Sequence, residues 1–462
     1  MTHCLGIPEI LRLVCSEVGR SSSLSIGLTC RAFLEAALDE IWHDLDSFQP
    51  LICCSPEDSL TGDEILTMQR VLNPEDLKRY LSVYAQRIRL FALHLGETNA
   101  CLDIDVFSSL QMVTEYRFGA LSPHLRHFTW PSPNTRYWRG SVFTEHISPF
   151  VSLFLGDSVQ SIEMECCGEA DLHPLHERST IFNTKRLPQV KALRLACADP
   201  YEELATRYIT SLPWPCLESV ILHDMFFHSA DPLCTPSKLQ HLRHLEIADT
   251  EGILSAATND ASAAALCHGN ASSFSSLRVI VIRSYHLWSL RAVLLFLPPT
   301  NVVEEFEAEL ETLSDRSDIQ NTIETILEYC NPSTFQRLKW VDCTVPGATI
   351  PEESIDPELE DDVGDVDIWG LCKFAELNHM TIRSGGHITL QPQDIPKVVT
   401  SWPNLNHLDL CSMAYSDGRM PSLNHTHLLE IVQGCLSLRY LGLRFDTCQL
   451  TGEEIPPTTN PF

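Results

Sequence analysis

Apolar residues along most of this chain recur in a Leu-x-x-Leu-x-Leu frame. The two clearest copies, at 214–222 and 402–410, both begin with Trp-Pro and continue with the same spacing. Because successive side chains of a strand point to opposite faces, the last two apolar positions of each frame predict one buried face of a short strand. The other copies are Ile88/Phe91/Leu93, Leu125/Phe128/Trp130, Val159/Ile162/Met164, Val190/Leu193/Leu195, Leu242/Leu245/Ile247, Leu277/Ile280/Ile282, Phe335/Leu338/Trp340, Leu377/Met380/Ile382 and Leu438/Leu441/Leu443, with Val303/Phe306/Ala308 as a weaker copy.

The frames recur roughly every 25 to 42 residues, which leaves room for a helix between successive strands. Helical spacing of apolar residues occurs between them at 74–87, 144–155, 201–212, 287–297, 318–330 and 426–434. The pattern therefore predicts an α/β chain in which short strands and helices alternate.

This alternation resembles leucine-rich repeats of the long, helix-containing type, in which strands line the concave face of a horseshoe and helices line the outside. The resemblance implies a leucine-rich-repeat solenoid over 75–450. A doubly wound α/β domain also alternates strands and helices, but it would not repeat the Trp-Pro phrase. Neither G-x-G-x-x-G nor G-x-x-x-x-G-K-[ST] occurs in the sequence, so we favour the solenoid.

The first forty-five residues have a different pattern, with apolar residues at helical spacing in three short segments. Pro8 suits the first turn of a helix, where its missing N–H is not needed, and Ser21 to Ser23 offer N-cap oxygens for the next helix. The pattern predicts a small three-helix unit, which buries too little surface to be stable without a partner or a neighbouring domain.

The order of residues in this unit resembles the F-box motif. Ile-Pro-x-Ile-Leu occupies 7–11, Leu-Thr-Cys-Arg-Ala-Phe occupies 28–33 and Ile-Trp-x-x-Leu occupies 41–45. Thr29 and Phe33 stand where the family usually has Val and Trp. In that family the unit docks on the adaptor subunit of SCF-type cullin–RING ubiquitin ligases. Carried over by position, the docking or supporting residues are Ile7, Pro8, Ile10, Leu11, Leu24, Leu28, Cys30, Phe33, Ile41 and Trp42.

Together the two patterns resemble a fungal-type F-box protein with C-terminal leucine-rich repeats. The domains expected are an F-box-like adaptor-docking domain at 1–46, a linker at 47–74, the solenoid at 75–450 and a C-terminal tail at 451–462. Within the solenoid, 351–367 holds nine carboxylates and no basic residue, which predicts a solvated insertion.

Residues beside the buried frame positions point to the open face of the predicted sheet. In the last four frames they form a basic and aromatic set within an acidic protein. We hypothesise that this face receives an acidic or phosphorylated segment of the target, the alternative being an ordinary solvated repeat face. A further hypothesis is that the acidic insertion folds over this face as an internal competitor. The candidate target-binding residues are Arg337, Lys339, His379, Arg383, His407, Tyr440 and Arg444.

Composition excludes several function classes. Sixty-one acidic against 32 basic residues give a net charge of -29, which repels a nucleic-acid backbone. No run of eighteen apolar residues and no basic, then apolar leader occurs, so neither membrane insertion nor secretion is expected, and we expect a cytoplasmic or nuclear protein. The eighteen cysteines include no Cys-x-x-Cys pair, so we expect free thiols and no metal site.

A catalytic role is not expected either, since neither G-x-S-x-G nor H-E-x-x-H occurs, and no cofactor is expected. The predicted function is a non-catalytic substrate-recognition subunit, with the ligase adaptor, its cullin complex and a target protein as partners. The alternative is a leucine-rich-repeat scaffold with no ligase role, whose N-terminal unit only caps the solenoid. The two differ in whether residues 5–45 expose their apolar side chains or bury them against the first repeat.

Overall fold

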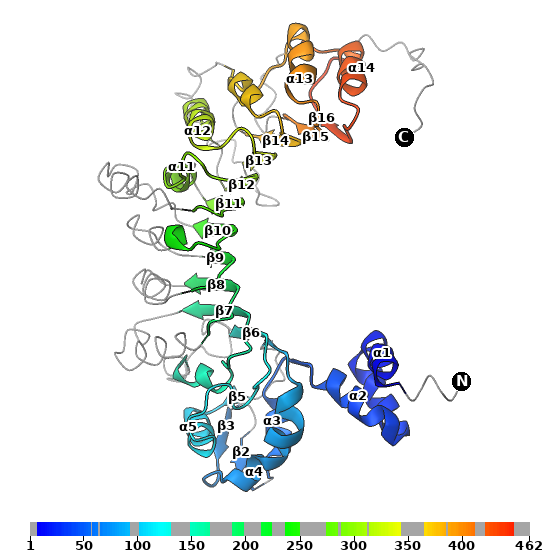
Figure 1. The fold of residues 1–462 in the computed structure, drawn as a ribbon, viewed down its shortest axis with the longest axis vertical. Helices are drawn as coiled ribbons and strands as arrows, with labels where there is room; N and C mark the ends of the chain where they lie inside the picture. The colour runs from blue at the N-terminus through cyan, green and yellow to red at the C-terminus, as the bar shows by residue number, and fades with distance from the viewer. Residues whose placement is uncertain are drawn as a thin grey trace. The chain divides into compact units, whose positions relative to one another are not determined.

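The computed structural model describes residues 7–56, 58–62, 65–92, 101–130, 148–166, 187–197, 214–223, 236–249, 274–284, 288–311, 314–342, 365–384, 387–411 and 421–447. The chain divides into two compact units, Met1–Met225 and Phe226–Phe462. In each unit, short parallel strands are connected by helices or by turns (Figure 1). The predicted α/β class and the alternation of strands and helices are therefore confirmed, and the arrangement is compatible with a solenoid.

Unit 1 begins with helices and continues with strands. Its described helices are α1 (Pro8–Thr29), α2 (Arg31–Ile41), α3 (Gln49–Cys54), α4 (Pro74–Arg79), η2 (Tyr80–Tyr84), η3 (Ala85–Arg87), α5 (Ile104–Val113) and η4 (Ser148–Leu153). Its described strands are β1 (Asp44–Leu45), β2 (Leu60–Thr61), β3 (Ile65–Met68), β4 (Leu90–Ala92), β5 (Cys101–Leu102), β6 (His127–Trp130), β7 (Ser161–Cys166), β8 (Ala192–Cys197) and β9 (Ser219–His223).

The main sheet of unit 1 has the order β1-β4-β6-β7-β8-β9, and its strands are parallel. The second apolar position of each frame pairs with the same position of the next strand, so these side chains form a buried ladder. The ladder runs through Phe91, Phe128, Ile162, Leu193 and Val220. The register therefore follows directly from the repeated frame.

The segment expected to link the helical unit to the solenoid, 47–74, has secondary structure of its own in unit 1. It contains α3, β2 and β3, and β3 pairs with β2 and β5 in a small second sheet. Phe48 is buried and packs its ring against Phe91 and Phe107, with ring centroids 5.7 and 5.4 Å away. The strands also start earlier than predicted, because β1 directly follows the N-terminal helices and pairs with β4. The two residues of β1 and the single ring of Phe48 show too little periodicity for the sequence to predict these contacts.

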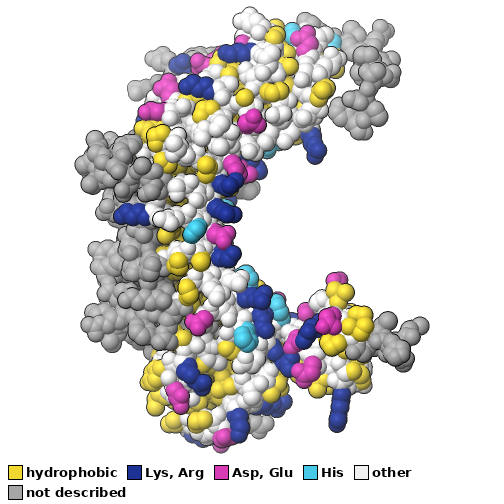
Figure 2. Space-filling view, viewed as in Figure 1, with side chains coloured by type: hydrophobic (Ala, Val, Ile, Leu, Met, Phe, Trp, Pro, Cys, Tyr) yellow, Lys and Arg dark blue, Asp and Glu magenta, His cyan; other side chains and the backbone are white. Residues whose placement is uncertain are grey.

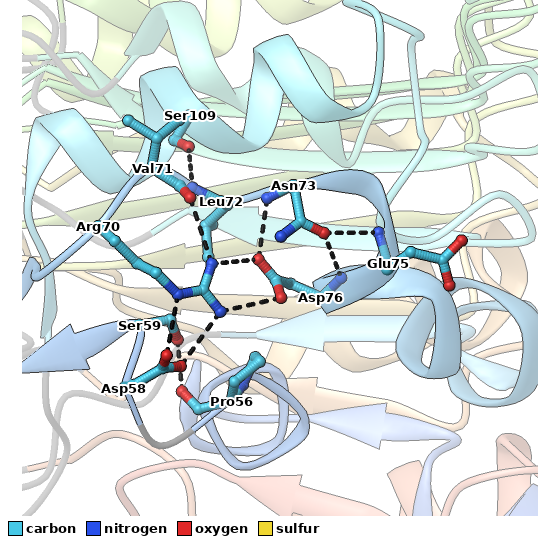
Figure 3. A network of polar contacts seen from close by, with 10 residues as sticks. All are labelled: Pro56, Asp58, Ser59, Arg70, Val71, Leu72, Asn73, Glu75, Asp76 and Ser109. Atoms are coloured by element: carbon cyan, nitrogen blue, oxygen red, sulfur yellow. Dashed lines mark hydrogen bonds and ion pairs between the residues drawn. The ribbon is translucent and has the colours of Figure 1, made fainter.

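A polar network fixes the end of this segment (Figure 3). The Arg70 guanidinium donates hydrogen bonds to the carboxylates of Asp58 and Asp76, and its shortest contact with Asp76 is 2.7 Å. Asn73 caps α4, since its side chain accepts from the backbone N–H of Glu75 and of Asp76. The hydrogen bond from Arg70 is the main reason that the pKa of Asp76 lies below its usual value. The network therefore joins the loop before β2 to the start of α4.

Unit 2 continues the alternation of strands and helices. Its described helices are η6 (Pro236–Lys238), α11 (Trp288–Leu294), α12 (Arg316–Tyr329), η9 (Trp369–Lys373), η10 (Pro392–Asp394), α13 (Ile395–Ser401) and α14 (His425–Gly434). Its described strands are β10 (His244–Asp249), β11 (Val279–Ser284), β12 (Glu305–Leu310), β13 (Arg337–Val341), β14 (His379–Arg383), β15 (His407–Asp409) and β16 (Tyr440–Gly442).

The strands of unit 2 are parallel and lie in sequence order from β10 to β16. The weaker frame predicted at Val303/Phe306/Ala308 is a full member, because all three side chains are buried and Phe306 pairs with Leu338. Helices connect successive strands and stack on one another, as α11 does on α12 and α13 on α14. Figure 1 shows α11 and α12 on the same side of these strands.

Local sequence explains where α12, the longest described helix of unit 2, begins and which face it buries. The Asp315 carboxylate accepts a hydrogen bond of 2.7 Å from the backbone N–H of Asp318 and so caps the first turn of α12. Ile319, Ile323 and Ile326 recur at helical spacing and are fully buried. Each such side chain contributes roughly 1.5–3 kcal/mol of hydrophobic stabilisation, which holds the helix against the sheet.

Candidate interaction surfaces

The N-terminal helical unit has a small core of its own. Gly19 has a φ of 74°, which a side chain would disfavour, and it breaks α1 into two helical segments. The core consists of Leu11, Cys15, Ala36 and Ala37, with Ile26, Phe33 and Ile41 packed against it. Three of the predicted docking residues, Leu11, Phe33 and Ile41, therefore support the unit from inside.

Other predicted docking residues lie on the surface of this unit. Leu28 is 78% exposed, Leu24 is 54% exposed, and Ile7, Pro8 and Cys30 are also exposed, whereas Ile10 is half-buried. Leu24 and Leu28 are one helical turn apart and so share a face of α1. The sequence patterns missed three further exposed apolar side chains, which are Leu13, Val18 and Leu34. Figure 2 shows apolar side chains gathered on the surface of α1 and α2.

The last predicted docking residue, Trp42, lies in the contact between this helical unit and the rest of unit 1. Its ring stacks on Tyr84 of η2, with centroids 4.1 Å apart and planes 17° apart. Next to this stack, the Arg87 guanidinium donates to the carboxylates of Glu35, at 2.5 Å, and Asp39. Glu35 and Asp39 are four residues apart on α2 and so form one acidic face. The four-residue spacing of Glu35 and Asp39 is the sequence feature that could have predicted the contact with Arg87, but it was not used.

The open face of unit 2 carries both signs of charge in alternation. Glu246 and Glu309 flank Arg283, with the Arg283–Glu309 contact at 3.0 Å. The Lys339 ammonium donates to Glu309 at 2.7 Å and to Glu307 at 2.6 Å. These contacts form one chain of alternating charge across β10 to β13, and Figure 2 shows Lys or Arg and Asp or Glu side chains next to one another over these strands.

The cations of this chain of charges are neutralised by their neighbouring carboxylates, and the contacts shift the pKa values of both partners. Burial raises the pKa of Glu309, but the hydrogen bonds from Lys339 and Arg283 outweigh burial and hold it below its usual value. Burial lowers the pKa of Lys339, and its bonds to Glu307 and Glu309 outweigh that effect, so the pKa is raised. Lys339, predicted to bind the target, is therefore occupied by carboxylates of its own chain.

Arg383 is occupied in the same way. Its guanidinium donates two hydrogen bonds, of 2.8 and 2.5 Å, to one carboxylate oxygen of Asp409, and reaches the Tyr440 hydroxyl at 3.4 Å. Asp409 is only 1% exposed, so its charge depends on this partner. A Cβ at Gly442 would lie 2.5 Å from the Asp409 carboxylate, which explains why β16 has a glycine there.

Four of the remaining candidates have planar side-chain groups and form a row across β13 to β16. Arg337 pairs in register with His379, His379 with His407, and His407 with Tyr440. The His379 and His407 rings stack with centroids 4.1 Å apart, and those of His407 and Tyr440 with centroids 4.3 Å apart. We call these four residues the Arg-His-His-Tyr row. Arg444, the last predicted residue, is exposed two residues beyond β16.

The two imidazoles of the row are neutral near pH 7. Burial is the main reason that the pKa of His379 falls to about 4. The neighbouring His407 and the cations of Arg337 and Lys339 lower the pKa of His379 further, and Asp409 opposes them. The pKa of His407 is also lowered, chiefly by burial. The sequence placed these residues on one face, but it did not show that their rings stack or that they lose their charge.

Lowering the pH from 7 to 5 is expected to destabilise unit 2 through His379. Its folded pKa of about 4 lies below the ordinary value of 6.5, so in this window the unfolded chain binds a proton that the folded chain does not. The stabilisation is complete above pH ~6.5 and is lost as the pH falls towards about 4. Because the side chain is half-buried, we expect a reduced effect of about 1 kcal/mol. Urea unfolding at pH 7 and 5 should show a smaller loss in His379→Gln than in the wild type, and equal losses would contradict this prediction.

Several predictions lie outside the described residues. They include the helix at 201–212, most of the acidic insertion, its proposed contact with the open face, and the tail at 451–462. Among the residues that the structure describes, none of the helices is long and apolar enough to cross a membrane. In the same part of the chain, His, Cys, Asp and Glu side chains form no group of three or more that would hold a metal ion.

Comparison with known proteins identifies no family for this chain. No family model matches it, and a search of curated proteins finds no match. Among solved structures, a similar chain comes from "Crystal structure of Rad7 and Elc1 complex in yeast", at 10% sequence identity and a TM-score of 0.26, covering 64% of this chain and 77% of that chain. A TM-score this low does not establish a common fold, so no conclusion about this chain rests on it.

Proposed function

We propose that this chain is the substrate-recognition subunit of an SCF-type cullin–RING ubiquitin ligase. In this proposal the helical unit of α1 and α2 docks on the ligase adaptor, and the open faces of the strands bind the protein to be ubiquitinated. The carrying observation is that Ile7, Leu24 and Leu28, which match the F-box motif, are exposed although the unit is already joined to the strands through Trp42. Large apolar side chains exposed in this way favour a partner surface.

The mechanism of such a subunit is proximity. A receptor that binds adaptor and target at once holds the target near the conjugating enzyme and raises the effective concentration of its lysines. The chemistry then belongs to other subunits, and this chain acts without catalysis of its own and without a cofactor. We also propose, on the same basis, that it works in the cytoplasm or nucleus, where these ligases act.

A leucine-rich-repeat scaffold without a ligase role is the second candidate. The observation that favours it is the contact of Trp42 with Tyr84 and of Arg87 with Glu35 and Asp39, which joins the helical unit to the strands as a cap would be joined. The two functions differ in what the exposed apolar face of α1 does. In a substrate receptor this face binds the adaptor, whereas in a cap it binds no partner.

Adaptor binding by the full-length chain distinguishes the two. We expect the wild type to bind the adaptor subunit with a dissociation constant of about 1 μM or tighter, and the Leu24→Asp, Leu28→Asp double variant to bind at least about tenfold more weakly, because charged side chains would oppose burial of this face. Both positions are exposed, so the variant should stay folded, whereas a charge at the core residue Leu11 would not test docking. Leu436→Asp, at an 85% exposed position of unit 2, is the matched control and should bind like the wild type. A folded wild type that does not bind would support the scaffold.

A further inference from the structure

The Arg-His-His-Tyr row differs from the rest of the open face of unit 2 because none of its members is a carboxylate. The charged residues of β10 to β13 neutralise one another, and Arg383 neutralises Asp409. The row instead presents a guanidinium, two neutral imidazoles and a phenol. His407 lies between the rings of His379 and Tyr440, so both its faces are covered and its accessible part is the ring edge, where the nitrogens are.

Arg337 in the row and Arg444 beyond β16 are the least neutralised cations of the predicted set. The nearest carboxylate oxygen to the Arg337 guanidinium belongs to Glu305 and is 3.9 Å away, and the buried Nε of Arg337 has no hydrogen-bond partner. Arg444 is exposed and forms no ion pair within the described part of the chain. An anion placed over the row would therefore meet the Arg337 guanidinium, whose ion pair with Glu305 is long, and the edge of the His407 ring, while the His379 Nε2 lies 3.3 Å from the Thr381 hydroxyl.

We infer that the Arg-His-His-Tyr row binds an acidic peptide segment and that this binding takes up protons. Neighbouring strands are about 4.8 Å apart, so a row across four strands is about 14 Å long. That length matches four or five residues of an extended peptide rather than a single small ion. The expected occupant is therefore a carboxylate-bearing segment of a partner protein. This inference rests on the proposed role of the open face in target binding, and it does not require adaptor docking.

Proton uptake follows from the groups that surround the two imidazoles. His379 faces Arg337 and Lys339 on β13 and His407 on β15. His407 faces Arg383 on β14 and Tyr440 on β16, and Arg337 also lowers its pKa. Among the described residues, the carboxylate that acts on both imidazoles is Asp409. Without a ligand, burial and the cations keep both rings neutral. Carboxylates bound along the ring edges would favour the charged form and raise both pKa values. By linkage, affinity must then increase as the pH falls, by up to about tenfold per pH unit for each proton taken up.

The test is the binding of a labelled octapeptide of glutamate to the full-length chain, measured by fluorescence anisotropy at pH 7.5 and 6.0. Salt near 0.15 M screens the long-range repulsion from the net charge of -29. We expect the affinity to be at least about fivefold higher at pH 6.0, and an octapeptide of glutamine to bind at least about tenfold more weakly than the glutamate peptide. At pH 7.5 the phosphate of a phosphoserine peptide is ionised. If this peptide binds more tightly than the glutamate peptide at that pH, the result would support the site and identify phosphate as its preferred anion.

Two variants separate the row from the rest of the surface. His379→Gln, His407→Gln keeps polar side chains that cannot be protonated, so it should retain binding at pH 7.5 and lose the gain at pH 6.0. His244→Gln, on β10 outside the row and next to Glu246, should keep the gain. Equal binding of the glutamate and glutamine peptides, or the same gain in the double variant as in the wild type, would overturn the inference. Either result would leave adaptor binding unaffected, so the two proposals fail independently.

Discussion

Trp340→Ala is expected to lower the free energy of unfolding of unit 2 by about 3–5 kcal/mol. The indole is completely buried in the middle of the sheet, where Trp340 pairs in register with Ala308 on one side and Ile382 on the other. Its Nε1–H also donates a hydrogen bond of 2.7 Å to the buried carboxylate of Asp342. Truncation would leave a large cavity and remove one of the donors that hold this charge.

Urea unfolding measures this effect, and two comparisons make it specific. Trp340→Phe keeps most of the ring volume but removes the donor, so it should lose less stability than Trp340→Ala. Leu436→Ala removes an exposed side chain and should change stability by less than about 0.5 kcal/mol. A loss below about 1 kcal/mol in Trp340→Ala would show that this frame residue does not form part of a continuous core.

Arg383→Ala is expected to destabilise unit 2 by about 2–3 kcal/mol. The change would leave the buried carboxylate of Asp409 without its charged partner, which in fully buried pairs costs about 3–5 kcal/mol. We expect less here, because Arg383 itself is partly exposed and water can approach the vacated position. The backbone N–H of Cys411, 3.2 Å from Asp409, would remain as a donor.

The matched comparisons for Arg383 are a double variant and a neighbouring arginine. Arg383→Ala, Asp409→Ala removes both charges and should be more stable than Arg383→Ala alone, since no carboxylate is left buried and unpaired. Arg337→Ala breaks only the 3.9 Å contact with Glu305 and should lose no more than about 1 kcal/mol. If Arg383→Ala were as stable as Arg337→Ala, the Asp409 pair would be of no structural importance, and Arg383 would again be a candidate for target binding.

The buried strand positions of both units were predictable from the spacing of apolar residues in the sequence. The middle apolar residue of each frame lies on a strand, and even in the weaker copy Val303, Phe306 and Ala308 are all buried, because alternation of side chains in a strand is a local property of the backbone. The helices at 318–330 and 426–434 were predicted from another local property, the recurrence of apolar residues at helical spacing. By contrast, α3, α5 and α13 were not predicted. With 6 and 7 residues, α3 and α13 are too short to show a clear helical period.

The candidate surfaces were predictable only in part. The sequence placed His379, His407 and Tyr440 on one face, but their stacking depends on strands about thirty residues apart being in register. It named Lys339 and Arg383 as candidate target-binding residues but did not show that both are paired with carboxylates of neighbouring strands. It also grouped Trp42 with the docking residues, although the ring stacks on Tyr84.

The sequence by itself therefore determined where the strands lie, which face of most strands is buried and how strands and helices alternate, because these properties follow from the local spacing of apolar residues. Only the tertiary structure decided which charges neutralise one another, which imidazoles lose their protons and which apolar side chains of α1 remain exposed. These properties depend on the distance between side chains far apart in the chain, and that distance is set by strand register and packing.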